Sequence, residues 1–251
     1  MATRTTVRGS VRGMAEQSNP AFAVAAFFLP LAALGYALTV ASLTEHTYVH
    51  VMAGILWTGT DLFFGMVLGP VIGGLDDETK AEVFQRLTPK MTFLMPALAI
   101  TTIGAGLDLA VRRGFFATPE PWFALFTLVN LPVALLLIGW QFDSLDDWRW
   151  LAPFGLITVG SIAWVALTIG SLQMPGALML ATLAIVTVLN IEGFGLILPG
   201  EVRVYLETRS ANPDPGVMSR IGMRNAKLAG VQGVFQLALI AVMVGLRWGG
   251  L

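Results

Sequence analysis

The chain has 251 residues, of which 55% are hydrophobic and 12% are charged, with a net charge of −1 and a mean hydropathy of +0.73. A soluble domain carries about 25% charged residues. Half that share, together with several continuous apolar runs, excludes a soluble globular protein and predicts an all-α, polytopic transmembrane helical bundle. The charge balance argues against a nucleic-acid partner. The absence of cysteine excludes a disulfide, a thiolate metal site and a covalently attached c-type haem.

The N-terminal segment is basic and lacks an apolar core. Residues 1–19 contain Arg4, Arg8 and Arg12. This composition predicts a cytoplasmic tail rather than a cleaved signal peptide. The remaining residues, 20–251, are expected to form one transmembrane helical domain in contact with the lipid bilayer.

Apolar runs near twenty residues long predict about seven membrane spans. Their approximate bounds are 20–43, 46–74, 89–111, 120–141, 149–171, 175–199 and 222–246. The charged segment 76–87 begins with a helix-capping residue, Asp76, and is expected to form a short helix at the membrane interface. Segment 200–221, which contains two prolines close together, is expected to be a polar loop.

The basic residues predict an orientation with the N-terminus inside and the C-terminus outside. With this topology the inner set is Arg4, Arg8, Arg12, Lys80, Arg86, Lys90, Arg149, Arg203, Arg209, Arg220, Arg224 and Lys227, and the outer set is Arg112, Arg113 and Arg247. The excess on the inner side agrees with the rule that cytoplasmic segments carry more Lys and Arg. The same topology places the histidines near the outer leaflet.

The second predicted span carries both histidines of the chain and one aspartate. In a helix, His46, His50, Trp57 and Asp61 lie roughly along one face. Ionisable groups at membrane depth are costly and usually face a bundle interior, a cavity or a cofactor. This face is therefore expected to point into the bundle.

His50 is the first candidate for a cofactor ligand. Neutral imidazole ligates haem iron, copper or zinc. The residue types leave two roles open for His50, a cofactor ligand or a hydrogen-bonded structural residue. His46 lies at the edge of the span, which favours an interfacial cap residue, although the His46/His50 pair could also chelate one metal ion such as copper.

A haem b held by His50 would need its second axial ligand from another residue type. No histidine exists outside the second span, so that ligand would be methionine, water or nothing. Met179 and Met243 lie at a similar predicted depth and are the candidates.

Two further acids lie inside predicted spans. Asp108, near the outer end of the third span, could accept a hydrogen bond from His50 and orient it, but a pair with Arg112 four residues on is favoured. Glu192 lies in a polar, glycine-containing break of the sixth span. Together with Asp61 and Lys227, Glu192 is expected either to relay protons or to lock helices together, and the sequence leaves both open.

A weak internal similarity links two pairs of spans. Segment 65–70 resembles segment 195–200, and in each case a charged connection and another span follow. Duplicated hairpins are common in membrane bundles.

One pattern resembles a known superfamily. His50 is followed by Trp57, Gly59 and the aromatic pair Phe63 and Phe64. This arrangement resembles the superfamily that contains the copper-resistance protein D membrane domain, the HemJ-type membrane protoporphyrinogen oxidases and the membrane part of a bacterial urate oxidase. Segments 86–104 and 225–228 are similar to later parts of that pattern. The match covers about a third of the chain.

The resemblance implies a helical bundle that binds haem b through His50. It also implies a functional role for Lys227, which matches a functional lysine of the protoporphyrinogen oxidases, and copper handling as the other theme of the superfamily. The chain has no phosphate loop, nucleophile elbow or His-Glu-x-x-His motif, so an oxidoreductase activity stays an open question.

The functional prediction is a multi-pass protein of the plasma membrane that holds haem b, or another metal, through His50. Its expected role is electron transfer with a quinone or a small redox partner, with Asp61, Glu192 and Lys227 moving protons. The alternative is a permease for copper or another small solute that uses Asp61 and Glu192. A second alternative is a structural subunit of a membrane complex or homo-oligomer.

Overall fold

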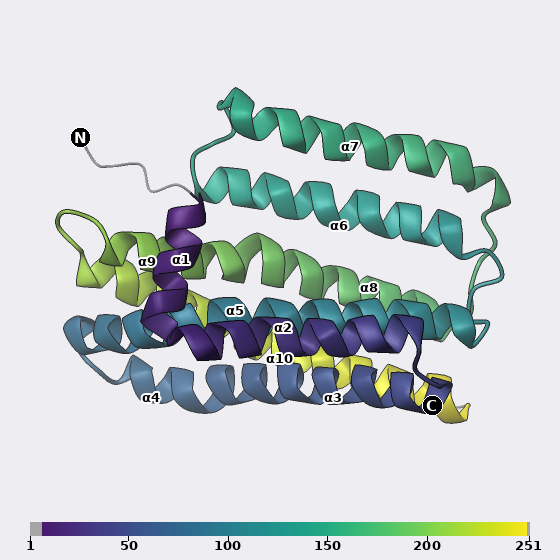
Figure 1. The fold of residues 1–251 in the computed structure, drawn as a ribbon, viewed down its shortest axis with the longest axis horizontal. Coiled ribbons are helices and arrows are strands. Elements are labelled where there is room, and N and C mark those ends of the chain that lie inside the picture. Colours follow the sequence, from purple (N-terminus) through teal and green to yellow (C-terminus); the bar gives the residue numbers. More distant parts are fainter. Residues whose placement is uncertain (1–6, 250–251) are drawn as a thin grey trace. The chain divides into compact units, whose positions relative to one another are not determined.

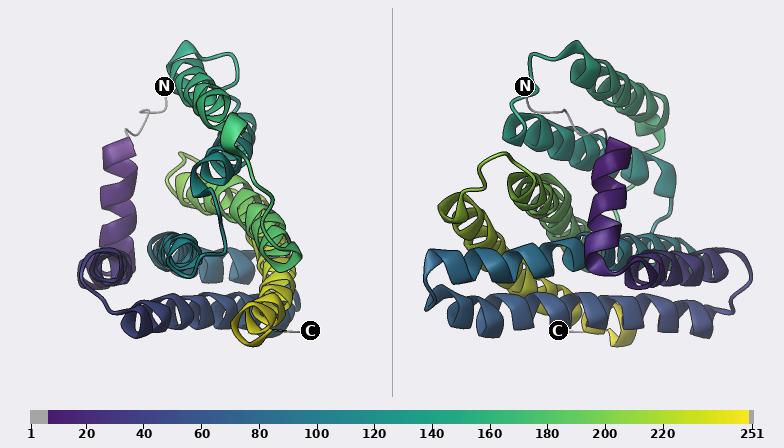
Figure 2. Two further views of the ribbon diagram at one scale, coloured as in Figure 1. Left: turned by 90° about the vertical axis from the view of Figure 1, so that its right-hand side faces the viewer. Right: turned by 60° about the vertical axis from the view of Figure 1, so that its left-hand side comes forward.

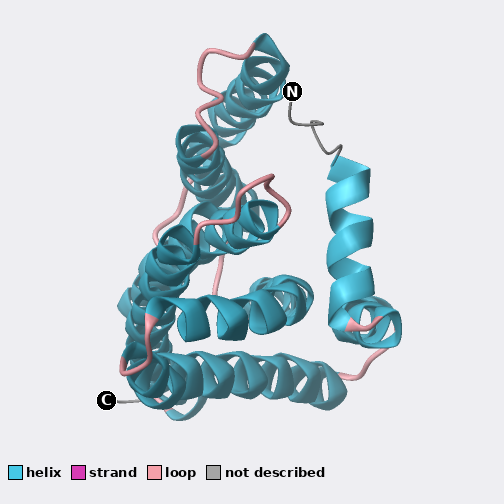
Figure 3. Ribbon diagram, turned by 90° about the vertical axis from the view of Figure 1, so that its left-hand side faces the viewer, coloured by secondary structure: helices cyan, strands magenta, loops and turns pink. Residues whose placement is uncertain are grey.

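The computed structural model describes residues 7–249, and these residues form helices joined by short connections, with no strand among them (Figures 1 and 3). Seven helices are long and apolar enough to cross a membrane. The all-α, polytopic prediction is therefore confirmed. Arg4 lies outside the described residues.

The helices follow one another in a simple order. They are α1 (Val7–Ser18), α2 (Pro20–Thr39), α3 (Leu43–Leu62), the π-helical η1 (Phe63–Leu68), α4 (Gly69–Gly73), α5 (Asp77–Arg112), α6 (Pro119–Gln141), α7 (Trp148–Thr168), the 3₁₀ turn η2 (Ile169–Ser171), α8 (Ala177–Glu192), the π-helical η3 (Gly193–Ile197), α9 (Leu198–Thr208) and α10 (Pro215–Trp248). The second and sixth membrane-crossing helices are composite, and run as α3–η1–α4 over Leu43–Gly73 and as α8–η3–α9 over Ala177–Thr208.

The chain divides into two compact units. The first unit contains the residues up to Gly106 together with Ile197–Gly233, and the second contains Leu107–Leu196 together with the residues from Val234 on. The first unit thus holds α1 to α4, most of α5, α9 and the first half of α10. The second holds α6 to α8 and the last parts of α5 and α10.

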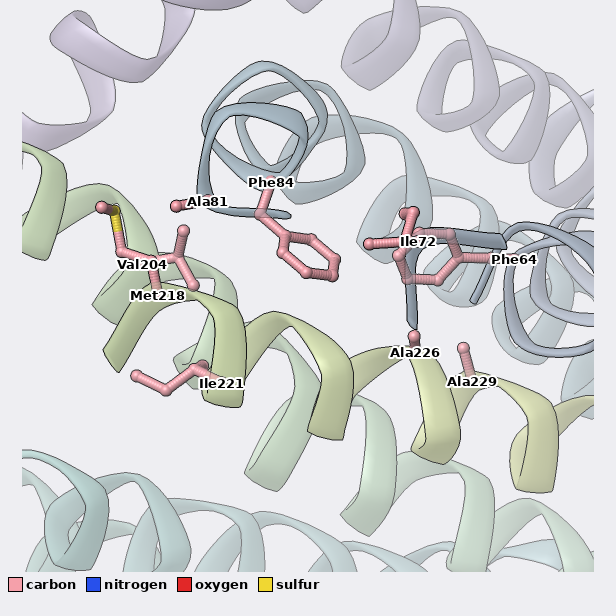
Figure 4. Packing of buried hydrophobic residues seen from close by; sticks show 9 residues of the cluster. All are labelled: Phe64, Ile72, Ala81, Phe84, Val204, Met218, Ile221, Ala226 and Ala229. Atoms are coloured by element: carbon pink, nitrogen blue, oxygen red, sulfur yellow. The ribbon is translucent and has the colours of Figure 1, made fainter. Parts of the chain in front are cut away.

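The core of the first unit forms where α4, the start of α5, α9 and α10 pack together. Its buried side chains are Phe64, Ile72, Ala81, Phe84, Val204, Met218, Ile221, Ala226 and Ala229 (Figure 4). Helix α1 crosses α2 at a steep angle (Figures 1 and 2), and the two meet at Asn19, whose side chain caps α2 by accepting a hydrogen bond from the N–H of Ala21.

Two glycines allow a close helix contact in the first unit. A Cβ at Gly65 in η1 would overlap the backbone of Gly230 in α10. Small residues let backbones approach in this way, and the approach allows dispersion contacts along both helices. The π-helical segment therefore packs directly on α10.

The segment 76–87 differs from its prediction, because it is the start of α5 and not a separate interfacial helix. Asp76 does cap it, as expected, by accepting a hydrogen bond from Thr79 N at 2.9 Å. Pro89 does not end the helix. It lacks an N–H and so frees the carbonyl of Gln85, which accepts a hydrogen bond from Gln17 Nε2 at 3.0 Å.

The segment 200–221 was predicted as a loop, and most of it is helical. α9 continues to Thr208 and α10 begins at Pro215, so the connection is only 209–214. Pro199 is tolerated because it follows η3, and the Gly195 carbonyl, four residues earlier, accepts a hydrogen bond from Gln141 Nε2 at 2.7 Å.

In the second unit, α6 packs on α7 and α8. A buried apolar cluster of Ala110, Phe116, Met179 and Leu183 joins the end of α5 to α8. Asp108 pairs with Arg112 at 2.6 Å, which confirms the predicted ion pair.

We expect Gly65→Ala to destabilise the protein by about 1–3 kcal/mol, because the added methyl group forces two packed helices apart. The measurement is the thermal unfolding temperature in detergent. Gly59→Ala is the matched control, since its added Cβ meets no atom within 4 Å. Equal effects of the two substitutions would contradict the packing account.

The cap of α5 predicts a pH dependence. Hydrogen bonds from the Thr79 backbone N–H and hydroxyl hold the pKa of the Asp76 carboxyl below its usual range. The cap therefore stabilises the helix start above the ordinary carboxyl pKa, and its contribution is lost as the pH falls through the lowered value. Amide hydrogen exchange at 77–80, corrected for intrinsic rates, should increase on acidification.

The matched control for this measurement is Asp76→Asn, which keeps an acceptor that does not titrate. We expect no additional exchange on acidification in this variant. The same acid-dependent increase in both proteins would show that another group is responsible.

Candidate functional site

Both histidines lie on α3 and face α5 within the first unit. The start of α3 is fixed by a capping box between Ser42 and Glu45. One turn further, His46 Nε2 lies 3.0 Å from the carbonyl oxygen of Ala105. After a second turn, His50 Nδ1 lies 2.8 Å from the carbonyl oxygen of Thr102. The two rings thus join α3 to the backbone of α5.

When a ring is neutral, these bonds assign the nitrogen that carries its proton. A carbonyl oxygen only accepts, so the bonded ring nitrogen must donate. His50 therefore carries its proton on Nδ1, and its Nε2 has a lone pair available for a ligand. His46 has the opposite arrangement, with its proton on Nε2.

Gly106 makes room for the His50 ring. A Cβ at this position would lie 2.8 Å from His50 Cε1 and 3.1 Å from His50 Nδ1. The ring is thus held from one side by the Thr102 carbonyl and sits against the bare backbone of Gly106. Metal-ligating histidines commonly donate their second ring N–H to a backbone carbonyl in this way.

His46 differs from its prediction as an interfacial cap residue. Its side chain is completely buried, with 0% exposure, and the capping is done by Ser42. The face of α3 that carries His46 is buried although the preceding residues 42–45 are exposed. The hydrogen bond between His46 and the Ala105 carbonyl joins α3 to α5.

The predicted polar face of α3 is confirmed as an inward face. Trp57 and Asp61 are buried, as is His46, and His50 is half-buried. Tyr48 on another face of the helix is exposed.

The methionine candidates belong to the other unit. Met179 is buried among the apolar side chains of Ala110, Phe116 and Leu183, and Met243 is half-buried near the end of α10. His50 belongs to the first unit. A methionine ligand to a group on His50 stays a prediction.

The two deep acids have similar local settings. Asp61 lies just before η1, and Glu192 ends α8 immediately before η3. Each π-helical segment leads to a proline at the start of the next helix, Pro70 or Pro199. π-helical turns are rare and occur often at functional sites. The weak internal similarity thus corresponds to a shared local structure.

The predicted relay residues are divided between the two units. Asp61 and Lys227 belong to the first unit and Glu192 to the second. Glu192 is buried, and its Oε2 has no hydrogen-bond partner within residues 7–249. Lys227 is exposed, although Asn225, two residues earlier, is fully buried.

The sequence reading missed a buried polar cluster built on Glu201. Glu201 of α9 is 7% exposed and accepts a hydrogen bond from Asn225 Nδ2 at 3.1 Å. The Thr88 side chain lies beside this carboxyl group, and Asn225 Nδ2 donates to the Ile197 carbonyl at 3.0 Å. The cluster joins α5, α9 and α10. In the sequence, the only sign of this cluster is that an acid, Glu201, directly follows Pro199 and Gly200. The same residues are also typical of a loop.

A metal site with several protein ligands has no support. Within the described part of the chain, no three His, Cys, Asp or Glu side chains lie together as a metal-binding group. Structural zinc sites need four ligands and catalytic sites usually three. A single free imidazole nitrogen instead suits an axial ligand to haem iron, whose other ligands come from the porphyrin.

Searches against family models, curated proteins and solved structures found no match for the chain.

We expect Glu201→Leu to destabilise the protein by about 1–3 kcal/mol, because it leaves the buried Thr88 and Asn225 side chains with fewer partners. Thermal unfolding in detergent measures the change. Glu82→Leu is the control, since the side chain of Glu82 is 70% exposed and surface substitutions usually change stability by less than about 0.5 kcal/mol. Adding Asn225→Leu to Glu201→Leu should cost less than the sum of the single changes. Strict additivity would contradict the cluster.

Proposed function

We propose that the chain is a plasma-membrane protein that binds haem b through His50 and exchanges electrons with a quinone or a small redox partner. The observation that supports this proposal most directly is the hydrogen bond from His50 Nδ1 to the Thr102 carbonyl. This bond orients the ring and keeps the proton away from Nε2, which is the nitrogen that a haem iron would bind.

The chain's own residues have distinct tasks in this proposal. Thr102 and Gly106 of α5 hold the His50 ring in a fixed orientation. His46 fastens α3 to α5 one turn away and so limits movement of the ligand. The pattern of His50, Trp57 and Gly59 that resembles a haem-binding superfamily lies on the same helix.

When bound, haem supplies one-electron transfer by cycling between ferrous and ferric iron. His50 would hold the iron, and its hydrogen bond and burial would be the protein's means of tuning the reduction potential. The hydrogen bond to the Thr102 carbonyl would increase the electron density on the His50 ring. Copper binding by His46 and His50 is less well supported, because no third His, Cys, Asp or Glu side chain joins them within residues 7–249.

A second candidate is transport of protons or of a small solute. The observation that favours it is Glu192, a buried acid with an Oε2 that lacks a partner within residues 7–249, directly before the π-helical segment η3. Interrupted helices with polar groups at membrane depth are typical of transporter sites.

An optical spectrum tests the first candidate. Protein produced in cells supplied with haem precursor should show a Soret band and, on reduction, α and β bands. We expect His50→Gln to lose most of the bound haem, because glutamine can still donate to the Thr102 carbonyl but offers no imidazole nitrogen. External imidazole should restore the Soret band in His50→Gly, which leaves room for it.

The matched control is His46→Gln, the same change one turn earlier, which should retain haem if it folds. Full haem content in His50→Gln would show that another residue is the ligand. A colourless wild-type protein would exclude the haem proposal, and proton-driven dye uptake in liposomes that requires Glu192 would then support transport.

A further inference from the structure

Three arginines gather where α9 packs on α10 in the first unit. Arg224 of α10 lies against the α9 backbone, with its Nη2 2.9 Å from the Cβ position of Gly200. Gly200 and Arg203 are three residues apart, so they share a face of α9. Arg220 precedes Arg224 by one turn of α10. The guanidinium groups of Arg203 and Arg224 are close enough to repel each other.

Arg224 Nη2 donates to Asn225 Oδ1 at 3.5 Å, and three carboxylates of α5 and α9 have other partners. Glu201 bonds to Asn225, and Glu207 accepts the backbone N–H of Asp214 at 3.0 Å. Asp77 accepts a hydrogen bond from Ser219 and pairs with Lys80. Within residues 7–249, neither Arg203 nor Arg220 forms an ion pair or a hydrogen bond.

Like charges held together at a partly buried site are unfavourable unless an anion lies between them. Arginine presents a planar fork of N–H donors that matches the oxygens of a phosphate group and binds them in pairs. The cluster therefore has the charge and the donor geometry for phosphate.

The surroundings favour a lipid as the source of that phosphate. Arg220, Lys227 and Val231 are exposed and, at spacings of seven and four, lie on one face of α10. This face is basic at Arg220 and Lys227 and apolar at Val231, so it matches the order of headgroup and acyl chain in a phospholipid. Basic pockets between membrane helices bind anionic headgroups in this way.

We infer that Arg203, Arg220 and Arg224 form a binding site for the phosphate headgroup of an anionic phospholipid, with its acyl chain along the Val231 face of α10. This site is separate from His50 and does not depend on haem.

Native mass spectrometry tests the inference. The full chain is released from membranes that contain phosphatidylglycerol and phosphatidylcholine. We expect retained phosphatidylglycerol in the wild type and an affinity about 30-fold lower in the double variant Arg203→Gln/Arg224→Gln, which corresponds to about 1 kcal/mol per lost contact. The matched control is Arg12→Gln/Arg86→Gln, which removes the same charge from two residues already paired with Glu16 and Glu82.

Equal loss in the control would overturn the site, because it would show a general charge effect. Loss of phosphatidylcholine to the same extent would also overturn it. If inorganic phosphate displaces the lipid or stabilises the protein equally, the ligand is a free anion and the lipid assignment is wrong. If the glutamine variant does not fold, the variant Arg203→Lys/Arg224→Lys provides a second measurement, because it keeps the charge. We expect it to retain part of the bound phosphatidylglycerol.

Discussion

Polar groups buried among membrane-spanning helices must find partners on neighbouring helices, because lipid offers none. The hydrogen bonds from the two histidines of α3 to the carbonyls of α5 follow from this constraint. They join the helices and they also decide which nitrogen of each ring carries the proton. A bond needed for packing thus also leaves the lone pair on the Nε2 of His50.

The same constraint accounts for two of the prolines inside the long helices. Pro89 frees one carbonyl in α5 and Pro199 frees another in η3. Each carbonyl receives the side-chain amide of a glutamine, Gln17 in the first unit and Gln141 in the second. These glutamines come from segments distant in sequence, so each of these two prolines coincides with a contact from another helix.

The spans, the inward face of α3 and the Asp108–Arg112 pair were all predictable, because apolar length and helical periodicity are local properties. The continuation of α9, the burial of His46 and the Glu201 cluster were not. A proline-glycine pair in the sequence is compatible with a loop and with a π-helical turn. Which of the two forms depends on a hydrogen-bond partner on another helix, here Gln141. For the candidate site, residue spacing identified His50, but the Thr102 and Gly106 contacts depend on tertiary packing. The local resemblance of η1 and η3 was visible only as a weak sequence similarity.

The central claim is that packing fixes the ring of His50 with Nε2 unprotonated. The chain contains only two histidines, so ¹⁵N NMR of histidine-labelled protein in lipid, assigned with His46→Gln, resolves every ring nitrogen. The account predicts a protonated Nδ1 and an unprotonated Nε2 for His50, and the reverse for His46. A protonated Nε2 on neutral His50 would contradict it.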